Sequence, residues 1–166
     1  MENIFLNEEK CFLVTKKGRT SGVLFTRKSD YRYYSYLMRK LKKKYQINIF
    51  AFCLLPDAVH MVLQPREDRA LGIFIEQLKE SYALYRQSRY QCNGTLWQRN
   101  HRRTCIKSDR DLFAHIKFVE FLPVNARLVL SPLEYVWSSC SHRVVSDNGI
   151  LDTVPGRFAE SRNIVR

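Results

Sequence analysis

The sequence holds little that would mark a membrane, secreted or zinc-binding protein. No uninterrupted apolar run approaches the roughly 18 residues that span a bilayer. Acidic side chains at positions 2, 8 and 9 stand where a signal peptide would have a basic segment and an apolar core, so we expect a cytoplasmic protein. The 5 cysteines are odd in number and form no C-x-x-C pair, which indicates neither a disulfide framework nor a zinc ribbon.

Acidic residues are also scarce relative to basic ones. The chain has 16 Asp and Glu against 28 Lys and Arg, which gives 166 residues a formal net charge of +12. Such a charge favours a polyanionic partner, although it says nothing about the fold. We therefore expect the partner to be nucleic acid and not a membrane, and a purely structural or protein-interaction module is disfavoured. A hydrophobic content of 45% suits one compact domain with a substantial core.

The spacing of apolar residues predicts the element order β-α-β-β-α-β-α. Period-2 and β-branched segments indicate strands, and apolar residues at helical spacing indicate helices. Strands are expected at 10–16, 47–55, 58–64 and 103–107, and helices at 29–45, 71–85 and 109–122. Pro56 and Asp57 predict the turn of a central hairpin, Ser108 predicts the cap of the third helix, and Pro123 is expected to end that helix.

This element order predicts an α+β fold of the ferredoxin-like class. In that arrangement an antiparallel sheet is covered by helices, which we expect to pack on one face. We place one domain at residues 1–145 and a polar C-terminal tail at 146–166. The tail contains Gly149 and Gly156 and is expected to be loosely attached.

Five stretches between about residues 10 and 143 occur in a characteristic order. They are a glycine turn at 18–25, Leu-Pro-Asp followed by His within 52–63, Gly-Thr-Leu-Trp-Gln-Arg at 94–99, Phe-Val-Glu-Phe-Leu-Pro-Val-Asn-Ala at 118–126, and Trp-Ser-Ser at 137–139. Together they resemble the IS200-like, HUH-type tyrosine transposases, and most closely the REP-associated members of that family.

The resemblance implies a catalytic site, and this sequence departs from it. Active members bind one divalent Mg or Mn ion through a His-x-His pair, and a helical tyrosine attacks the scissile phosphate. Here the pair is Ala58 and His60, the tyrosine position is Phe118, and a polar amide position near the metal is Leu122. We therefore expect no cofactor and predict that the chemistry is lost.

Several alternatives stay open at this point. Tyr82 or Tyr85 could replace the nucleophile, although both match core positions of a helix, and His101 or His115 could supply a metal ligand. We expect His60 to hydrogen-bond a neighbour and not to bind metal. An active nicking and joining transposase is the main alternative. An experimenter would also choose the Ala and Phe exchanges to trap an uncut complex, but Leu122 does not fit that explanation.

The basic clusters predict the nucleic-acid interface. A tryptophan followed by a run of guanidinium groups would combine base stacking with phosphate contacts. The predicted binding residues are Lys16, Lys17, Arg19, Arg27, Trp97, Arg99, His101, Arg102, Arg103 and Lys107. The resemblance implies single-stranded or hairpin DNA as the partner. A structured RNA remains an alternative, and the chain could act as a monomer or a homodimer.

Overall fold

A four-stranded antiparallel sheet forms the centre of the computed structural model, which describes residues 10–19, 22–145 and 149–154. Its strands are β1 (Cys11–Lys17), β2 (Ile47–Leu55), β3 (Ala58–Pro65) and β4 (Arg102–Ile106), in the spatial order β2-β3-β1-β4. The helices are α1 (Lys28–Tyr45), α2 (Asp68–Tyr90), α3 (Asp109–Asn125), α4 (Ser139–Val145) and the short 3₁₀ helix η1 (Pro132–Glu134). This order and pairing confirm the ferredoxin-like α+β class.

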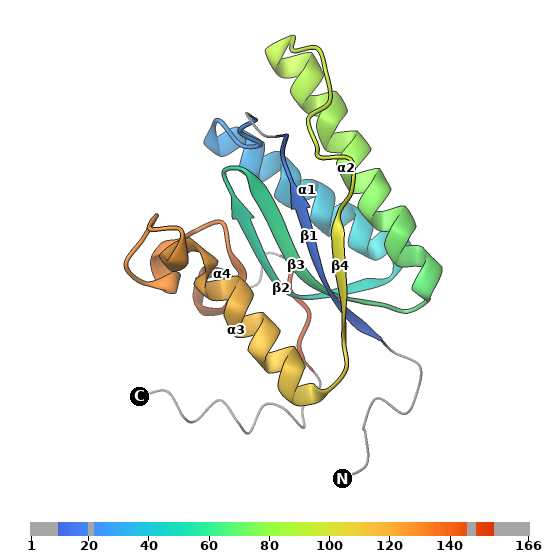
Figure 1. Cartoon of the computed structure of the whole chain (residues 1–166), viewed down its shortest axis with the longest axis vertical. Coiled ribbons are helices and arrows are strands. Elements are labelled where there is room, and N and C mark those ends of the chain that lie inside the picture. The colour runs from blue at the N-terminus through green and yellow to red at the C-terminus, as the bar shows by residue number, and fades with distance from the viewer. Residues whose placement is uncertain (1–9, 20–21, 146–148, 155–166) are drawn as a thin grey trace.

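The helices cover both faces of the sheet, so the prediction of one covered face is wrong for α3. Figure 1 shows α1 and α2 on one side of the sheet and α3 with α4 on the other. Strands β2 and β3 are buried at almost every position. Successive side chains of a strand point to opposite faces of the sheet, and helices cover both faces here. We call these sides the α2 face, to which Val14, Val59 and Met61 point, and the α3 face, to which Ala58 and Val62 point.

Helix α3 begins as predicted but ends later. The Ser108 hydroxyl accepts a hydrogen bond from the Asp111 amide at 3.1 Å, which confirms the N-cap. Pro123 does not stop the helix, because it lies in the last turn, where its missing N–H removes only one intrahelical hydrogen bond. Beyond it, the Ala126 amide still donates to the Leu122 carbonyl at 2.8 Å.

Part of the predicted C-terminal tail is firmly attached. Ile150 is fully buried, and the Asp152 carboxylate accepts a hydrogen bond from the Ile49 amide at 2.8 Å and pairs with the Lys42 ammonium. The expectation of loose attachment is therefore wrong for residues 149–154. An apolar residue and an ion pair hold this segment against the edge strand β2. Residues 146–148 and 155–166 lie outside the described part of the chain.

Candidate functional site

The hairpin β2–β3 and strand β1 bring His60 beside Thr15 on the α3 face. The register pairs Thr15 with His60 and Lys17 with Ala58, and Thr15 Oγ1 lies 3.0 Å from His60 Nδ1. This contact confirms the expected hydrogen bond of His60 to a neighbour. Burial, and secondarily the charge of Lys17, lowers the pKa of His60 to about 4, against a smaller opposing effect of Asp57. The imidazole is therefore neutral at neutral pH.

The residues at the predicted catalytic positions lie together on the α3 face. Phe118 projects from α3 into a hollow of about 390 Å³ that His60 and Thr15 also line. Ala58 is buried in the apolar cluster beneath this helix, and Leu122 packs against the same cluster. The fold thus brings positions 58, 60, 118 and 122 to one face, as the resemblance implied, but with apolar side chains at three of them.

The side chains at this site do not fit a divalent metal ion. Ala58 has no ligand atom, and the remaining imidazole is hydrogen-bonded to Thr15. His115 lines the neighbouring hollow with Leu13 and Phe118, and its Nδ1 lies 2.6 Å from the Asp111 carbonyl within its own helix. Among the described residues, no group of three or more His, Cys, Asp or Glu side chains could hold a metal.

The two tyrosines considered as replacement nucleophiles lie on the opposite side of the sheet. Tyr82 is fully buried in α2, and its hydroxyl donates to the Leu24 carbonyl at 2.6 Å. The Tyr85 hydroxyl donates to the carboxylate of Asp30 at 3.0 Å. Tyr82 is therefore a core residue, as predicted, whereas Tyr85 is half-buried and packs against the core through its stack on Tyr33 of α1.

Asp30 is the centre of a polar network that the sequence did not reveal. Its carboxylate is fully buried, accepts hydrogen bonds from the Thr26 and Arg27 amides, and pairs with Arg86 at 3.3 Å. The Tyr90 hydroxyl also donates to it, at 2.7 Å. Burial raises the pKa of Asp30, but these hydrogen bonds outweigh burial, so the pKa lies below its usual value.

The predicted nucleic-acid-binding residues divide between buried and exposed positions. Trp97 is 2% exposed, and its indole N–H donates to the Lys79 carbonyl at 3.1 Å. Lys16 is 3% exposed, and its ammonium donates to the Gln98 carbonyl at 2.6 Å. Trp97 is therefore a core residue and not a platform for bases, because an isolated bridge to Gly18 draws its loop onto the sheet. This burial also argues against a direct nucleic-acid contact by Lys16.

The other predicted binding residues are half-buried or exposed, and they do not form one surface. Arg103 places its guanidinium over the Phe12 ring at 4.0 Å on the α2 face. Lys17 and Arg102 line the α3-face hollow together with His60 and Phe118. The remaining exposed or half-buried residues are Arg19, Arg27, Arg99, His101 and Lys107. Burial, and secondarily the charge of Lys16, lowers the pKa of His101.

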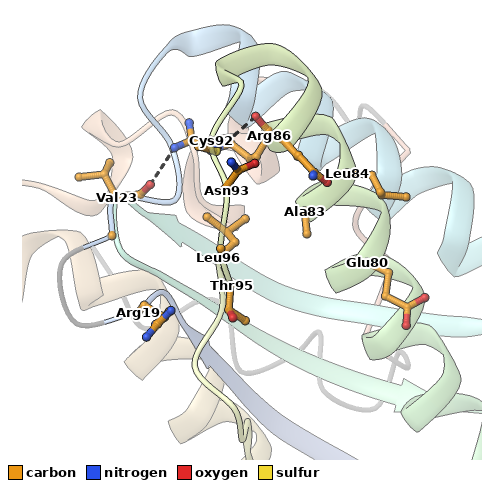
Figure 2. Close-up of a pocket in the computed structure, with 13 residues that line it drawn as sticks. Arg19, Val23, Glu80, Ala83, Leu84, Arg86, Cys92, Asn93, Thr95 and Leu96 are labelled. Carbon is orange, nitrogen blue, oxygen red and sulfur yellow. Dashed lines mark hydrogen bonds between the residues drawn. The ribbon is translucent and has the colours of Figure 1, made fainter.

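A larger hollow, of about 850 Å³, lies on the other side of the molecule. Figure 2 shows it between Ala83 and Leu84 of α2 and the segment that carries Thr95 and Leu96. The guanidinium of Arg86, which also lines it, already donates to the Val23 carbonyl at 3.1 Å and to Asp30. The volume of a hollow therefore does not identify the candidate catalytic site, because this larger hollow contains none of the predicted catalytic positions.

Two of the five recognised motifs have mainly structural roles. A Cβ atom at Gly18 would lie 2.7 Å from the Gly22 carbonyl oxygen, so the tight turn requires glycine. In the Trp-Ser-Ser motif, the Trp137 ring stacks on Tyr31 with centroids 4.7 Å apart. The Ser139 hydroxyl donates to Glu120 at 2.7 Å and accepts from the Phe52 amide at 3.2 Å. That motif therefore joins α3 to strand β2.

Comparisons with known proteins agree with this architecture. A Haemophilus influenzae protein, named a candidate REP-associated tyrosine transposase, is 24% identical over 139 residues, which cover 77% of this chain and 77% of that protein. The solved structure of a REP-associated tyrosine transposase bound to a REP hairpin has the same fold. Its TM-score is 0.69 at 16% identity, over 87% of this chain and 92% of that chain.

No helix within the described ranges is long and apolar enough to cross a membrane.

A family model described as "Transposase IS200 like" matches residues 11–112, which is more than half of the chain. The match contains β1, the β2–β3 hairpin with His60, and the Trp97 loop, and it ends near the start of α3. The chain therefore belongs to the IS200-like transposase family.

Proposed function

We propose that this protein binds single-stranded or hairpin DNA and does not cut it. The observation that carries the proposal is the content of the α3-face hollow, where Phe118 offers a phenyl ring and His60 a single neutral imidazole. A phenyl ring has no hydroxyl to attack phosphorus, and one imidazole does not hold a divalent ion in place. The family frame is kept, while the groups that would perform the chemistry are replaced.

Three further observations support DNA as the partner. The formal net charge is +12, and the exposed cations Lys17 and Arg102 line the hollow itself. A solved relative of the same fold was determined with a REP hairpin bound. Cations of this kind neutralise phosphates and release counterions, so the proposed binding would depend strongly on salt.

A binding titration tests this proposal. A labelled DNA hairpin with single-stranded flanks, the same strand without its hairpin, and an RNA hairpin of equal length are titrated at several salt concentrations. We expect the flanked DNA hairpin to bind most tightly and its affinity to fall steeply as salt rises. Tighter binding of the RNA would replace DNA by RNA as the partner. No binding to any probe at low salt would refute the proposal.

A second candidate function, DNA cleavage at a rearranged site, is favoured by the Thr15–His60 contact. A hydroxyl 3.0 Å from an imidazole is the arrangement of a nucleophile and its general base. Against this function, a pKa of about 4 makes His60 a weak base. Cleavage by the wild-type protein that is abolished in a Thr15→Val variant would establish this candidate and displace the first.

Restoring the family residues tests whether the frame still supports a metal site. In an Ala58→His, Phe118→Tyr, Leu122→Asn variant, the side chains at 58 and 60 lie on one face of β3 and can share one ion. We expect calorimetry to show Mn²⁺ uptake. The matched control carries the changes at 118 and 122 alone and should bind no metal. A folded triple variant without uptake would contradict this expectation.

A further inference from the structure

The hollow on the α3 face has a chemistry that differs from that of a cutting site. We propose that it holds an unpaired base of the bound DNA strand, stacked on the ring of Phe118. This inference rests on the proposed function and names the part of the nucleic acid that the site takes.

The Phe118 ring is accessible from the hollow, unlike the apolar side chains of α3 that face the sheet. Phe118 is 48% exposed, whereas Leu112 and Val119 of the same helix are almost completely buried. The ring lines both the hollow of about 390 Å³ and a neighbouring one of about 340 Å³, so open space adjoins it in two directions. An exposed aromatic face in a concave site is a suitable surface for a nucleobase, because every base presents a flat π-face.

The groups around the ring match the other parts of a nucleotide. Lys17 of β1 and Arg102 of β4 are exposed cations that can contact a phosphate. The side-chain amides of Gln98 and Asn100 can donate to and accept from the polar edge of a base. Cations, amides and an aromatic ring in one hollow favour a nucleotide over a purely apolar peptide segment.

The replaced residues explain why a base, and not a phosphate, would occupy the centre of the hollow. A tyrosine hydroxyl beside a metal ion would draw the phosphate to that point. With Phe118 at the tyrosine position, its ring and Leu13 give the hollow an apolar surface, while the cations Lys17 and Arg102 lie at exposed positions. A strand can then place its base inward and its phosphates outward. The volume of about 390 Å³ lies within the ~300–1,000 Å³ typical of small-ligand sites.

The test compares two exposed phenylalanines of α3. Phe118 lines the hollow, whereas Phe121 is 41% exposed and does not line it, so Phe121→Leu is a matched control for Phe118→Leu. The probe is the DNA hairpin with single-stranded flanks, prepared with normal flanks and with abasic flanks that keep every phosphate. A third form has single 2-aminopurine bases in the flanks, whose fluorescence falls on stacking.

We expect Phe118→Leu to weaken binding of the normally flanked hairpin about 10-fold and to leave binding of the abasic probe unchanged. Phe121→Leu should bind both probes like wild type, and Phe118→Tyr, which keeps the ring, should retain most of the affinity. One flank position should show 2-aminopurine quenching that the Phe118→Leu variant loses. Circular dichroism and thermal unfolding would confirm that both leucine variants are folded.

The other outcomes separate this inference from the proposed function. If wild type binds the flanked hairpin and Phe118→Leu binds it equally well, the base site is refuted while DNA binding stands. An equal loss for the normal and abasic probes would also refute it, because the ring would then act on the backbone or on the fold. If wild-type protein binds no probe, the proposed function fails and this inference fails with it.

Discussion

The two faces of the sheet use their polar and aromatic residues differently. On the α2 face, Asp30 and Arg86 are buried partners, and the Tyr82 hydroxyl is bonded to a backbone carbonyl. On the α3 face, the Phe118 ring is half exposed in a hollow bordered by cations. The first arrangement stabilises the fold, and the second leaves groups available to a ligand. Substitutions on the two faces should therefore separate stability from binding.

The largest effect on the free energy of unfolding is expected from a substitution of Asp30, on the α2 face. Asp30→Ala removes a buried carboxylate and leaves the guanidinium of Arg86 without its counter-charge, which should lower the free energy of unfolding by about 3–5 kcal/mol. Urea unfolding measures this change. The control is Asp68→Ala, which breaks an exposed ion pair with Lys10 and should change stability by less than about 0.5 kcal/mol. Equal losses in the two variants would contradict the assigned role of the network.

Trp97 and Phe118 provide the sharpest test of the difference between the faces. Trp97→Ala should cost about 3–5 kcal/mol of unfolding free energy, because the indole is 2% exposed in the core. Phe118→Ala, at a side chain that is 48% exposed, should cost less than about 1 kcal/mol. Chemical denaturation compares them. Should Trp97→Ala remain as stable as wild type and lose DNA binding, the tryptophan would be a contact residue after all.

His60 should make stability depend on pH. Its pKa is about 4 in the fold and 6.5 in the unfolded chain, so the unfolded state binds the proton first as pH falls. The contribution of the neutral His60 to the free energy of unfolding is complete above about pH 6.5. It decreases from there to about pH 4, by roughly 3 kcal/mol at most. We expect the free energy of unfolding, measured across this pH range, to fall more steeply with decreasing pH for wild type than for a His60→Gln variant. The same pH dependence in both proteins would rule out His60 as its source.

The smallest effect is expected on the salt dependence of DNA binding, when the two adjacent arginines of β4 are substituted in turn. Arg102 lines the α3-face hollow, whereas the guanidinium of Arg103 lies over Phe12 on the opposite face. Arg102→Gln should reduce the slope of log affinity against log salt by about 1, because one phosphate contact is lost. Arg103→Gln should leave the slope nearly unchanged. A larger reduction for Arg103 would move the DNA path to the α2 face.

Local pattern was sufficient for most elements, whereas the position of the altered site was implied by the family resemblance. Strand alternation places Ala58 and His60 on the same face of β3, and helix spacing places Phe118 and Leu122 one turn apart. The burial of Lys16 could also have been predicted, since it alternates onto the same side of β1 as Val14. These conclusions need only the period of one element.

Features that depend on long-range contacts could not be predicted in this way. The burial of Trp97 follows from its bridge to Gly18, which lies far away in the sequence. The Asp30 network requires residues of α2 to meet the start of α1. The position of α3 on the opposite face was indicated only weakly, by the nearly continuous apolar sequence of β2. Spacing within one segment does not report such pairings.

The most direct test of the central claim is a search for a covalent protein–DNA adduct. Wild-type protein is incubated with the flanked DNA hairpin, labelled at either end, in Mg²⁺ or Mn²⁺, and the products are separated under denaturing conditions and by mass spectrometry. We expect a saturable complex under native conditions, with full-length DNA and unmodified protein after denaturation. A cleaved strand joined to any side chain of the chain as written would contradict this expectation.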